Sequence, residues 1–110
     1  MSASVTVRNW GQYRVLGEVG KEVKVKELIV APYSSLSMQK HEKRNEFWFV
    51  AKGYGILKGW GTMPRELNLH EHAIIETNEW HQLVNPTEDI LHIIEIQYGE
   101  ECIEEDITRK

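Results

Sequence analysis

The sequence contains few of the features that mark secreted, disulfide-linked or membrane-spanning proteins. Cys102 is the one cysteine among 110 residues, which excludes an intrachain disulfide and a zinc site built from several cysteines. No apolar run approaches the roughly 18 residues that a membrane-spanning helix needs. The first ten residues, MSASVTVRNW, lack the charged and then apolar pattern of a signal peptide. We therefore expect a cytoplasmic protein with no membrane partner.

Concentrated positive charge is also missing. The chain has 13 Lys and Arg against 17 Asp and Glu, which gives a net charge of −4, and its basic residues are scattered. Nucleic acid and anionic membranes are therefore not expected as partners. Hydrophobic residues make up 41% and charged residues 27%, as in an ordinary soluble domain. A chain of this length supports one domain with one core, which we assign to residues 1–110.

Patterns typical of helices are almost absent, and patterns typical of strands fill the chain. No stretch of about 12 residues combines apolar positions at helical spacing with a capping residue in front. Short β-branched or aromatic runs, separated by turn residues, lie at 4–9, 13–19, 24–31, 46–53, 55–60, 65–70, 72–77, 81–85 and 90–98. Such runs without helices between them predict an all-β, antiparallel sandwich or barrel. Only EEDI at 104–107 is expected to form one short helical turn.

The five histidines are the first candidates for chemistry, although a single histidine in a strand is more often structural or exposed. His70 and His72 would share a face if they lay on one strand, but they fall at the turn before the run at 72–77, and a polar turn is the simpler interpretation. His92 lies among Ile and Leu residues, so we expect it on the outer face of the last long strand. His41 and His81 differ because of the residues spaced around them.

Positions 39–53 read Q-x-H-x4-E-x6-G, and positions 76–85 read E-x-N-x2-H-x3-N. These patterns resemble the two signatures of the cupin superfamily, G-x5-H-x-H-x4-E-x6-G and G-x5-P-x-G-x2-H-x3-N. The fold that this resemblance implies is the cupin double-stranded β-helix, an antiparallel jelly-roll barrel, which agrees with the all-β pattern of the chain.

Four blocks narrow the resemblance to the type II mannose-6-phosphate isomerase domain, familiar as the C-terminal part of bifunctional mannose-1-phosphate guanylyltransferases. RNWGQY at 8–13 matches the family's R-P-W-G-x-Y, and LSMQKHEKRNEFW at 36–48 aligns without a gap with L-S-L-Q-M-H-H-H-R-A-E-H-W. EIQYG at 95–99 matches an E-x-Q-x-G segment, and EEDITR at 104–109 matches an E-D-D-I-V-R ending. Each block alone is weak, but four blocks in order at nearly the family's spacing are a strong indication.

The resemblance implies a metal site whose ligands are Gln39, His41, Glu46 and His81, with the glutamine in place of the first histidine. Gln39 and His41 are two residues apart on one strand and would face the same way. We expect the charged turn after them to bring Glu46 in from the neighbouring strand, and His81 to come from a third strand across the barrel. This donor set suits a divalent ion; zinc is favoured, and manganese, iron and nickel stay open. A polar barrel mouth without metal is the alternative.

The activity that the resemblance implies is metal-dependent isomerisation of mannose 6-phosphate to fructose 6-phosphate. Arg44, which matches the arginine of the family's first motif, and Lys43 are the candidate catalytic residues. Arg109, Glu95 and Gln97 are candidate substrate-binding residues, although Glu95 and Gln97 could instead hydrogen-bond to the metal ligands. The expected partners are a small-molecule sugar phosphate and a second copy of the chain in a homodimer.

Several positions depart from the family pattern and raise the question whether its catalysis has been kept. Glu42 and Lys43 stand where the family has histidines, and Tyr33 stands where a glycine opens the first signature. Glu76 and Asn78 replace the proline and glycine of the second signature, although asparagine tolerates the left-handed backbone that such a glycine would adopt.

Two other functions stay open on the sequence alone. One is a non-catalytic cupin that binds a sugar or a nucleotide sugar. The other is a different metal chemistry such as dioxygenation, since His41, Glu46 and His81 make a set of two histidines and one carboxylate. Cupins carry many reactions on one fold, so the fold does not decide among these functions.

Overall fold

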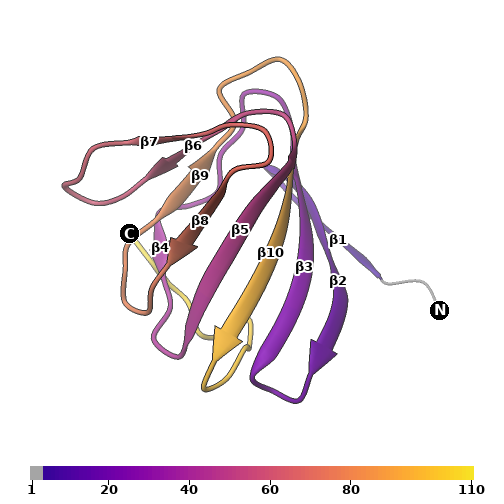
Figure 1. Ribbon diagram of the computed structural model, residues 1–110, viewed down its shortest axis with the longest axis vertical. Coiled ribbons are helices and arrows are strands. Elements are labelled where there is room, and N and C mark those ends of the chain that lie inside the picture. Colours follow the sequence, from indigo (N-terminus) through magenta and orange to yellow (C-terminus); the bar gives the residue numbers. More distant parts are fainter. Residues whose placement is uncertain (1–3) are drawn as a thin grey trace.

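The computed structural model describes residues 4–110, and in this range the chain forms eleven strands and no helix. The largest sheet has six antiparallel strands in the order β1-β2-β3-β10-β5-β8 (Figure 1). Its strands are β1 (Val5–Arg8), β2 (Gly11–Val19), β3 (Val23–Val30), β5 (Arg44–Lys52), β8 (His72–Ile75) and β10 (Leu91–Gly99). The predicted all-β antiparallel class is therefore confirmed; residues 1–3 of the predicted domain lie outside the described residues.

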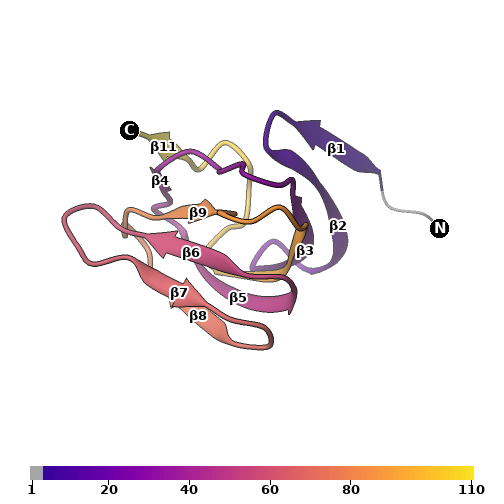
Figure 2. The same cartoon turned by 90° about the horizontal axis from the view of Figure 1, so that it is seen from above.

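Two smaller sheets lie against the large one, as the view from above shows (Figure 2). The first has the order β7-β6-β9 and contains β6 (Gly55–Lys58), β7 (Arg65–Leu67) and β9 (Gln82–Val84). The second pairs β4 (Gln39–Lys40) with β11 (Thr108–Arg109) near the C-terminus. Isolated bridges join Ser35 to Val84 and Gln39 to His81, so the segment around β4 runs along the edge of β9.

The interior of the barrel is apolar at one end and polar at the other. Side chains alternate across β10, so Leu91, Ile93, Glu95 and Gln97 all point inward. Leu91 and Ile93 belong to the hydrophobic core, whose buried members are Leu28, Val30, Leu36, Trp48, Val50, Leu67, Ala73, Ile75, Leu83, Leu91 and Ile93. Because β3 and β5 both run antiparallel to β10, their polar inward residues meet Glu95 and Gln97 at the other end. Polar residues therefore collect at one end of a single barrel.

The C-terminal segment differs from its prediction. The NH of Asp106 donates to the carbonyl of Ile103 at 3.3 Å, which closes a turn, and the chain then extends into β11. The helical turn predicted at 104–107 does not continue as a helix, because the NH of Ile107 donates to the carbonyl of Glu105 at 2.9 Å and pairing with β4 begins at Thr108. Within residues 4–110 there is no helix long and apolar enough to cross a membrane.

Within residues 4–110, three residues other than glycine adopt positive φ, and all three occupy glycine positions of the cupin signatures. Tyr33 has φ 55°, His70 has φ 65° and Asn78 has φ 63°. The prediction that Asn78 keeps a left-handed backbone is confirmed. His70 takes the place of the glycine that opens the second signature. These three residues therefore hold the left-handed backbone that favours glycine, at a conformational cost of roughly 1 kcal/mol per residue.

Tyr33 offers a test of that cost, because its side chain is 73% exposed and contributes little packing. Tyr33→Gly is expected to unfold with a free energy about 1 kcal/mol higher than Tyr33→Ala. Ser37, which is exposed and has no positive φ, is the matched site, and there the alanine variant should be the more stable of the pair. Urea denaturation of the four variants measures both differences. The same order at both positions would contradict the assignment of strain to Tyr33.

Candidate metal centre

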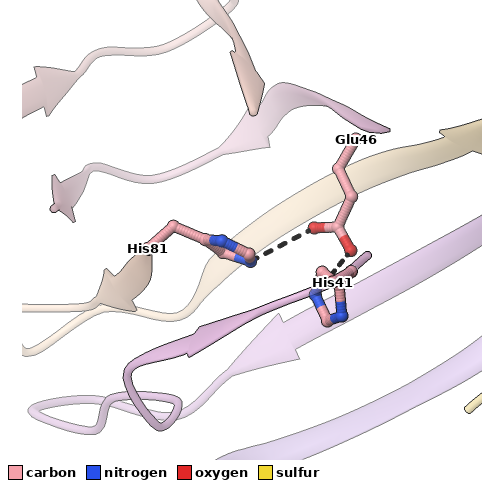
Figure 3. A group of neighbouring side chains, drawn as sticks. All are labelled: His41, Glu46 and His81. Carbon is pink, nitrogen blue, oxygen red and sulfur yellow. Dashed lines mark ion pairs between the residues drawn. The ribbon is translucent and has the colours of Figure 1, made fainter. Parts of the chain in front are cut away.

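Three of the four implied ligands converge on one point inside the polar end of the barrel (Figure 3). Nε2 of His41 lies 3.1 Å from Oε2 of Glu46, and Nε2 of His81 lies 3.7 Å from Oε1 of the same carboxylate. One donor atom from each residue lies within 4.8 Å of the others, and all three side chains are buried. This spacing suits donors that surround one cation.

The fourth implied ligand, Gln39, lies beside His81. Gln39 and His81 exchange two backbone hydrogen bonds of 2.9 Å, and residues paired in this way project their side chains to the same face. Gln39 is half-buried and lines the same cavity as His41 and Glu46. The structure thus brings the implied ligands to one end of the barrel.

The strands that supply these ligands differ from the expected ones. Glu46 was expected on a strand next to that of Gln39, but β5 belongs to the six-stranded sheet and β4 pairs with β11 in another sheet. His81 was expected across the barrel from Gln39, but the two residues are bridged. The correction has a simple cause: residues 41–43 carry the chain from one sheet to the other, and spacing in the sequence does not reveal such a crossing.

Backbone carbonyls orient both histidines so that Nε2 faces Glu46 in the ligand cluster. Nδ1 of His41 donates to the carbonyl of Asp106 at 2.7 Å, and Nδ1 of His81 donates to the carbonyl of Glu79 at 2.9 Å. A carbonyl only accepts, so Nδ1 carries a hydrogen in both rings, and Nε2 is the nitrogen left to face Glu46 and a metal. Burial lowers the pKa of His81 and outweighs the opposing charge of Glu46. Metal-binding histidines are oriented in this way by their surroundings.

Glu46 is held as an oriented anion. Nε of Arg44 donates to Oε2 at 3.1 Å, and Nε1 of Trp48 donates to Oε1 at 3.0 Å. Burial raises the pKa of Glu46, but the hydrogen bond from His41 and the charges of His81, His41 and Arg44 outweigh it and hold the pKa well below its usual range. Two imidazoles, one carboxylate and one amide therefore offer a donor set that fits a divalent ion.

The two candidate catalytic residues lie in different places. Arg44 is buried, and besides Glu46 it donates from Nη1 to the carbonyl of Ile103 at 2.9 Å. Lys43 is exposed, forms an ion pair of 3.4 Å with Glu101 and does not line the cavity. The structure brings Arg44 to the site and leaves Lys43 on the outer surface of the turn, as it does the neighbouring Glu42.

Gln39, His41 and Glu46 border a cavity of about 520 Å³. The three candidate substrate-binding residues, Arg109, Glu95 and Gln97, all line it. Nε1 of Trp48 donates to Oε2 of Glu95 at 3.0 Å, and Nε2 of Gln97 donates to Oε1 at 2.9 Å. Trp48 also bonds Glu46, so Glu95 both faces the cavity and is linked to a metal ligand. Glu95 can therefore both contact a substrate and support the metal ligands, which were considered as alternatives from the sequence.

Several residues of the site were missed in the sequence. Lys26 lies inside the cavity and is 4% exposed, although VKVKELIV suggests that the valines face inward. Leu28 and Val30 are buried and set the phase of β3, which turns Lys24 and Lys26 toward the interior. The sequence shows that side chains alternate along β3. Only the apolar residues at the end of the strand show which alternate set faces the interior.

The pKa of Glu95 is raised to about 8, first by burial and then by the nearby charge of Glu46. A carboxyl whose folded pKa exceeds its unfolded value of 4.5 stabilises the fold fully below pH 4.5, and this stabilisation is lost as the pH rises through 8. In metal-stripped protein, Glu95→Gln should therefore gain stability relative to wild type between pH 5 and pH 9, on the order of 3 kcal/mol.

Thermal melts of both proteins with a chelator, at steps across this pH range, measure the difference. Glu18→Gln, which removes an exposed carboxylate on β2, is the matched control and should follow wild type at every pH. A constant difference between Glu95→Gln and wild type across the range would show that Glu95 titrates at an ordinary pKa.

Comparison with protein families gives a match over residues 2–110 to the family described as "Mannose-6-phosphate isomerase C-terminal". The chain belongs to this family. Relatives include the mannose-1-phosphate guanylyltransferase of Sinorhizobium fredii, 35% identical over 105 residues, and the mannose-1-phosphate guanylyltransferase RfbM of Salmonella typhimurium, 37% identical over 103 residues. These matches cover 94% and 93% of the chain but only 20% and 21% of the relatives. The chain therefore spans about a fifth of their length.

Solved structures establish the fold of this family member as a cupin double-stranded β-helix. A cupin-2 domain protein of Rhodospirillum rubrum superposes with a TM-score of 0.77 at 16% identity, covering 94% of this chain and 78% of the other. The capsular polysaccharide assembling protein CapF of Staphylococcus aureus gives a TM-score of 0.79 at 16% identity, covering 99% of this chain and 32% of CapF. The predicted cupin barrel is confirmed.

Proposed function

We propose that this cupin domain is a metal-dependent sugar-phosphate isomerase that converts mannose 6-phosphate to fructose 6-phosphate. The observation that carries the proposal is the buried donor set of His41, Glu46 and His81, of which His41 and Glu46 line a cavity of about 520 Å³ together with the buried carboxyl of Glu95. Two comparisons support the choice of a mannose phosphate: the chain belongs to the mannose-6-phosphate isomerase C-terminal family, and its relatives include mannose-1-phosphate guanylyltransferases.

The metal site supplies the electrophile of this reaction. A divalent ion bound by Gln39, His41, Glu46 and His81, with zinc as the first choice, would polarise the oxygens on the two reacting carbons of the sugar. Arg44 positions Glu46 by its hydrogen bond to Oε2 and so keeps the carboxylate aimed at the ligand cluster. The buried guanidinium also offsets negative charge that develops at the polar end of the barrel.

Glu95 is the residue that we assign to proton transfer. Isomerisation of an aldose to a ketose moves one hydrogen from C2 to C1 and one from O2 to O1, through a cis-enediol, and needs no redox partner. Glu95 takes the proton from C2 and returns it to C1, as a general base and then a general acid. Trp48 and Gln97 each donate to one oxygen of its carboxylate and hold it against the cavity. Arg109, which lines the cavity on β11, contacts the substrate.

A coupled assay for fructose 6-phosphate formed from mannose 6-phosphate tests the proposal. Metal-loaded wild type should turn over the substrate, and Glu95→Gln should lower kcat by about 100-fold or more at unchanged metal content, since a general base contributes that much. Glu18→Gln should match wild type. Binding of mannose 6-phosphate without turnover at full metal loading would instead favour a non-catalytic sugar-binding cupin.

A further inference from the structure

The cavity contains a second ionic cluster, separate from the ligand cluster. Nζ of Lys26 forms an ion pair with Oε2 of Glu104, and Nζ of Lys24 lies 3.9 Å from the same oxygen. The hydroxyl of Tyr13 donates to Oε1 of Glu104 at 3.5 Å, and Nζ of Lys26 lies 4.3 Å from the centre of the Tyr13 ring. Two lysines and a phenol thus surround one carboxylate.

Lys26 and Glu104 differ in how deeply their side chains are buried. The side chain of Lys26 is 5% exposed and projects from the middle of β3 in the six-stranded sheet. The side chain of Glu104 is 50% exposed and belongs to a turn between β10 and β11. A buried ammonium needs an anion beside it, whereas an exposed carboxylate loses little when it returns to water. The lysine is therefore a fixed site and Glu104 an exchangeable occupant.

The distance of this cluster from the metal ligands suits a sugar phosphate. Lys26 pairs across the sheet with Glu95, and Glu95 pairs with Trp48 on β5, two residues from Glu46. β3 and β5 flank β10, which separates their backbones by roughly 10 Å. An open-chain hexose 6-phosphate carries its reacting carbons at one end and its phosphate at the other. It could reach Glu95 and the ligand cluster with the first end and Lys26 with the second.

We propose that Lys26 and Tyr13, assisted by the charge of Lys24, bind the phosphate group of a phosphate monoester, and that the carboxylate of Glu104 occupies this site until the substrate displaces it. Lysine and phenol hydrogens that now reach a carboxylate are equally suited to phosphate oxygens. The choice of a sugar phosphate rests on the proposed function, but the anion site does not. Glu104 would exclude sugars without phosphate, because only an anion can replace it beside Lys26.

Calorimetric titration of the full chain with mannose 6-phosphate and with inorganic phosphate tests the site. Lys26→Met, which removes the charge, should weaken binding of mannose 6-phosphate at least tenfold, and Lys52→Met, an exposed lysine on β5, should not. Glu104→Gln, which removes the competing charge, should strengthen binding of both ligands several-fold. Glu105→Gln, the exposed neighbour in the same turn, should leave both affinities as in wild type.

Unchanged or weaker phosphate binding in Glu104→Gln would overturn the proposal, and this variant changes only a half-exposed side chain, so it remains informative if Lys26→Met fails to fold. Wild-type affinity of a folded Lys26→Met protein would also overturn it. Phosphate binding that depends on Lys26 in a protein with no isomerase turnover would support the anion site and contradict the isomerase. Turnover with a KM that Lys26→Met does not raise would support the isomerase and contradict the anion site.

Discussion

Glu46→Gln is expected to weaken the binding of a divalent ion by more than 100-fold. The substitution keeps the shape of the side chain but replaces the charged ligand with a neutral amide. Arg44 is 5% exposed and donates to Glu46 at 3.1 Å, so its positive charge would then lie beside the cation without compensation. Loss of a residue that merely orients a ligand already costs 10- to 100-fold in metal affinity, and the loss of the only carboxylate among the four ligands should exceed that.

Titration of metal-stripped protein with a divalent ion, followed by calorimetry, measures this effect. Glu88→Gln, which removes an exposed carboxylate in the turn before β10, should bind the ion as wild type does. Metal affinity in Glu46→Gln within tenfold of wild type would indicate that Glu46 serves only as the counter-ion of Arg44. Far-UV spectra and melts of each variant establish that the barrel is intact before the titrations are compared.

The second large effect concerns stability rather than chemistry. Asn85, the last residue of the second cupin signature, is fully buried and lies where the chain turns from β9 toward β10. Its Nδ2 donates to the carbonyls of Val30, Ala31 and Asp89 at 3.1, 3.1 and 2.8 Å, and its Oδ1 accepts from the NH of Thr87 at 3.0 Å. Asn85→Ala removes these four hydrogen bonds from a buried turn and should lower the free energy of unfolding by about 4 kcal/mol.

Urea denaturation gives this difference directly. Asn68→Ala is the matched control, since Asn68 is exposed and its side chain bonds Glu71 at the surface, and it should change the free energy of unfolding by less than about 1 kcal/mol. Equal effects of the two substitutions would mean that water enters the Asn85 turn and replaces the lost hydrogen bonds. The asparagine of this signature would then have no structural role in the barrel.

The sequence was sufficient to predict an all-β antiparallel sandwich or barrel, because its short strands alternate in polarity and no helical pattern competes with them. The resemblance to the family motifs was also sufficient to name Gln39, His41, Glu46 and His81, which gather at one end of the barrel. It could not show which strands would carry them together. That depends on the crossing at residues 41–43 and on the bridge between Gln39 and His81, which local pattern does not encode.

The polar contents of the cavity were harder to predict for a physical reason. Lys26 and Glu95 are charged residues in strands, and such residues normally face solvent. They face inward here because Leu28, Val30, Leu91 and Ile93 fix the phase of β3 and β10 at the apolar end. The carbonyls of Asp106 and Glu79, which orient the two histidines, carry no side-chain signature at all.

Lys43 illustrates the limit of a motif match. It precedes Arg44 at a position where the family's first motif has histidine, and successive residues at the start of a strand point to opposite faces. Arg44 therefore enters the barrel, and Lys43 remains outside with Glu101. Alignment to the motif predicted a chemical role for Arg44, and Lys43 was a secondary candidate at a position where the motif has histidine. The structure places only Arg44 near the ligands.

The dependence of turnover on bound metal tests the proposed function most directly. Metal-stripped protein is loaded with increasing amounts of zinc, or of manganese, iron or nickel in parallel, and conversion of mannose 6-phosphate to fructose 6-phosphate is measured at each step. Turnover is expected to be absent in the stripped protein, to rise in proportion to bound ion and to level off at one ion per chain. No turnover at full loading with any of the four ions, or turnover that is unaffected by removal of the metal, would contradict a metal-dependent isomerase.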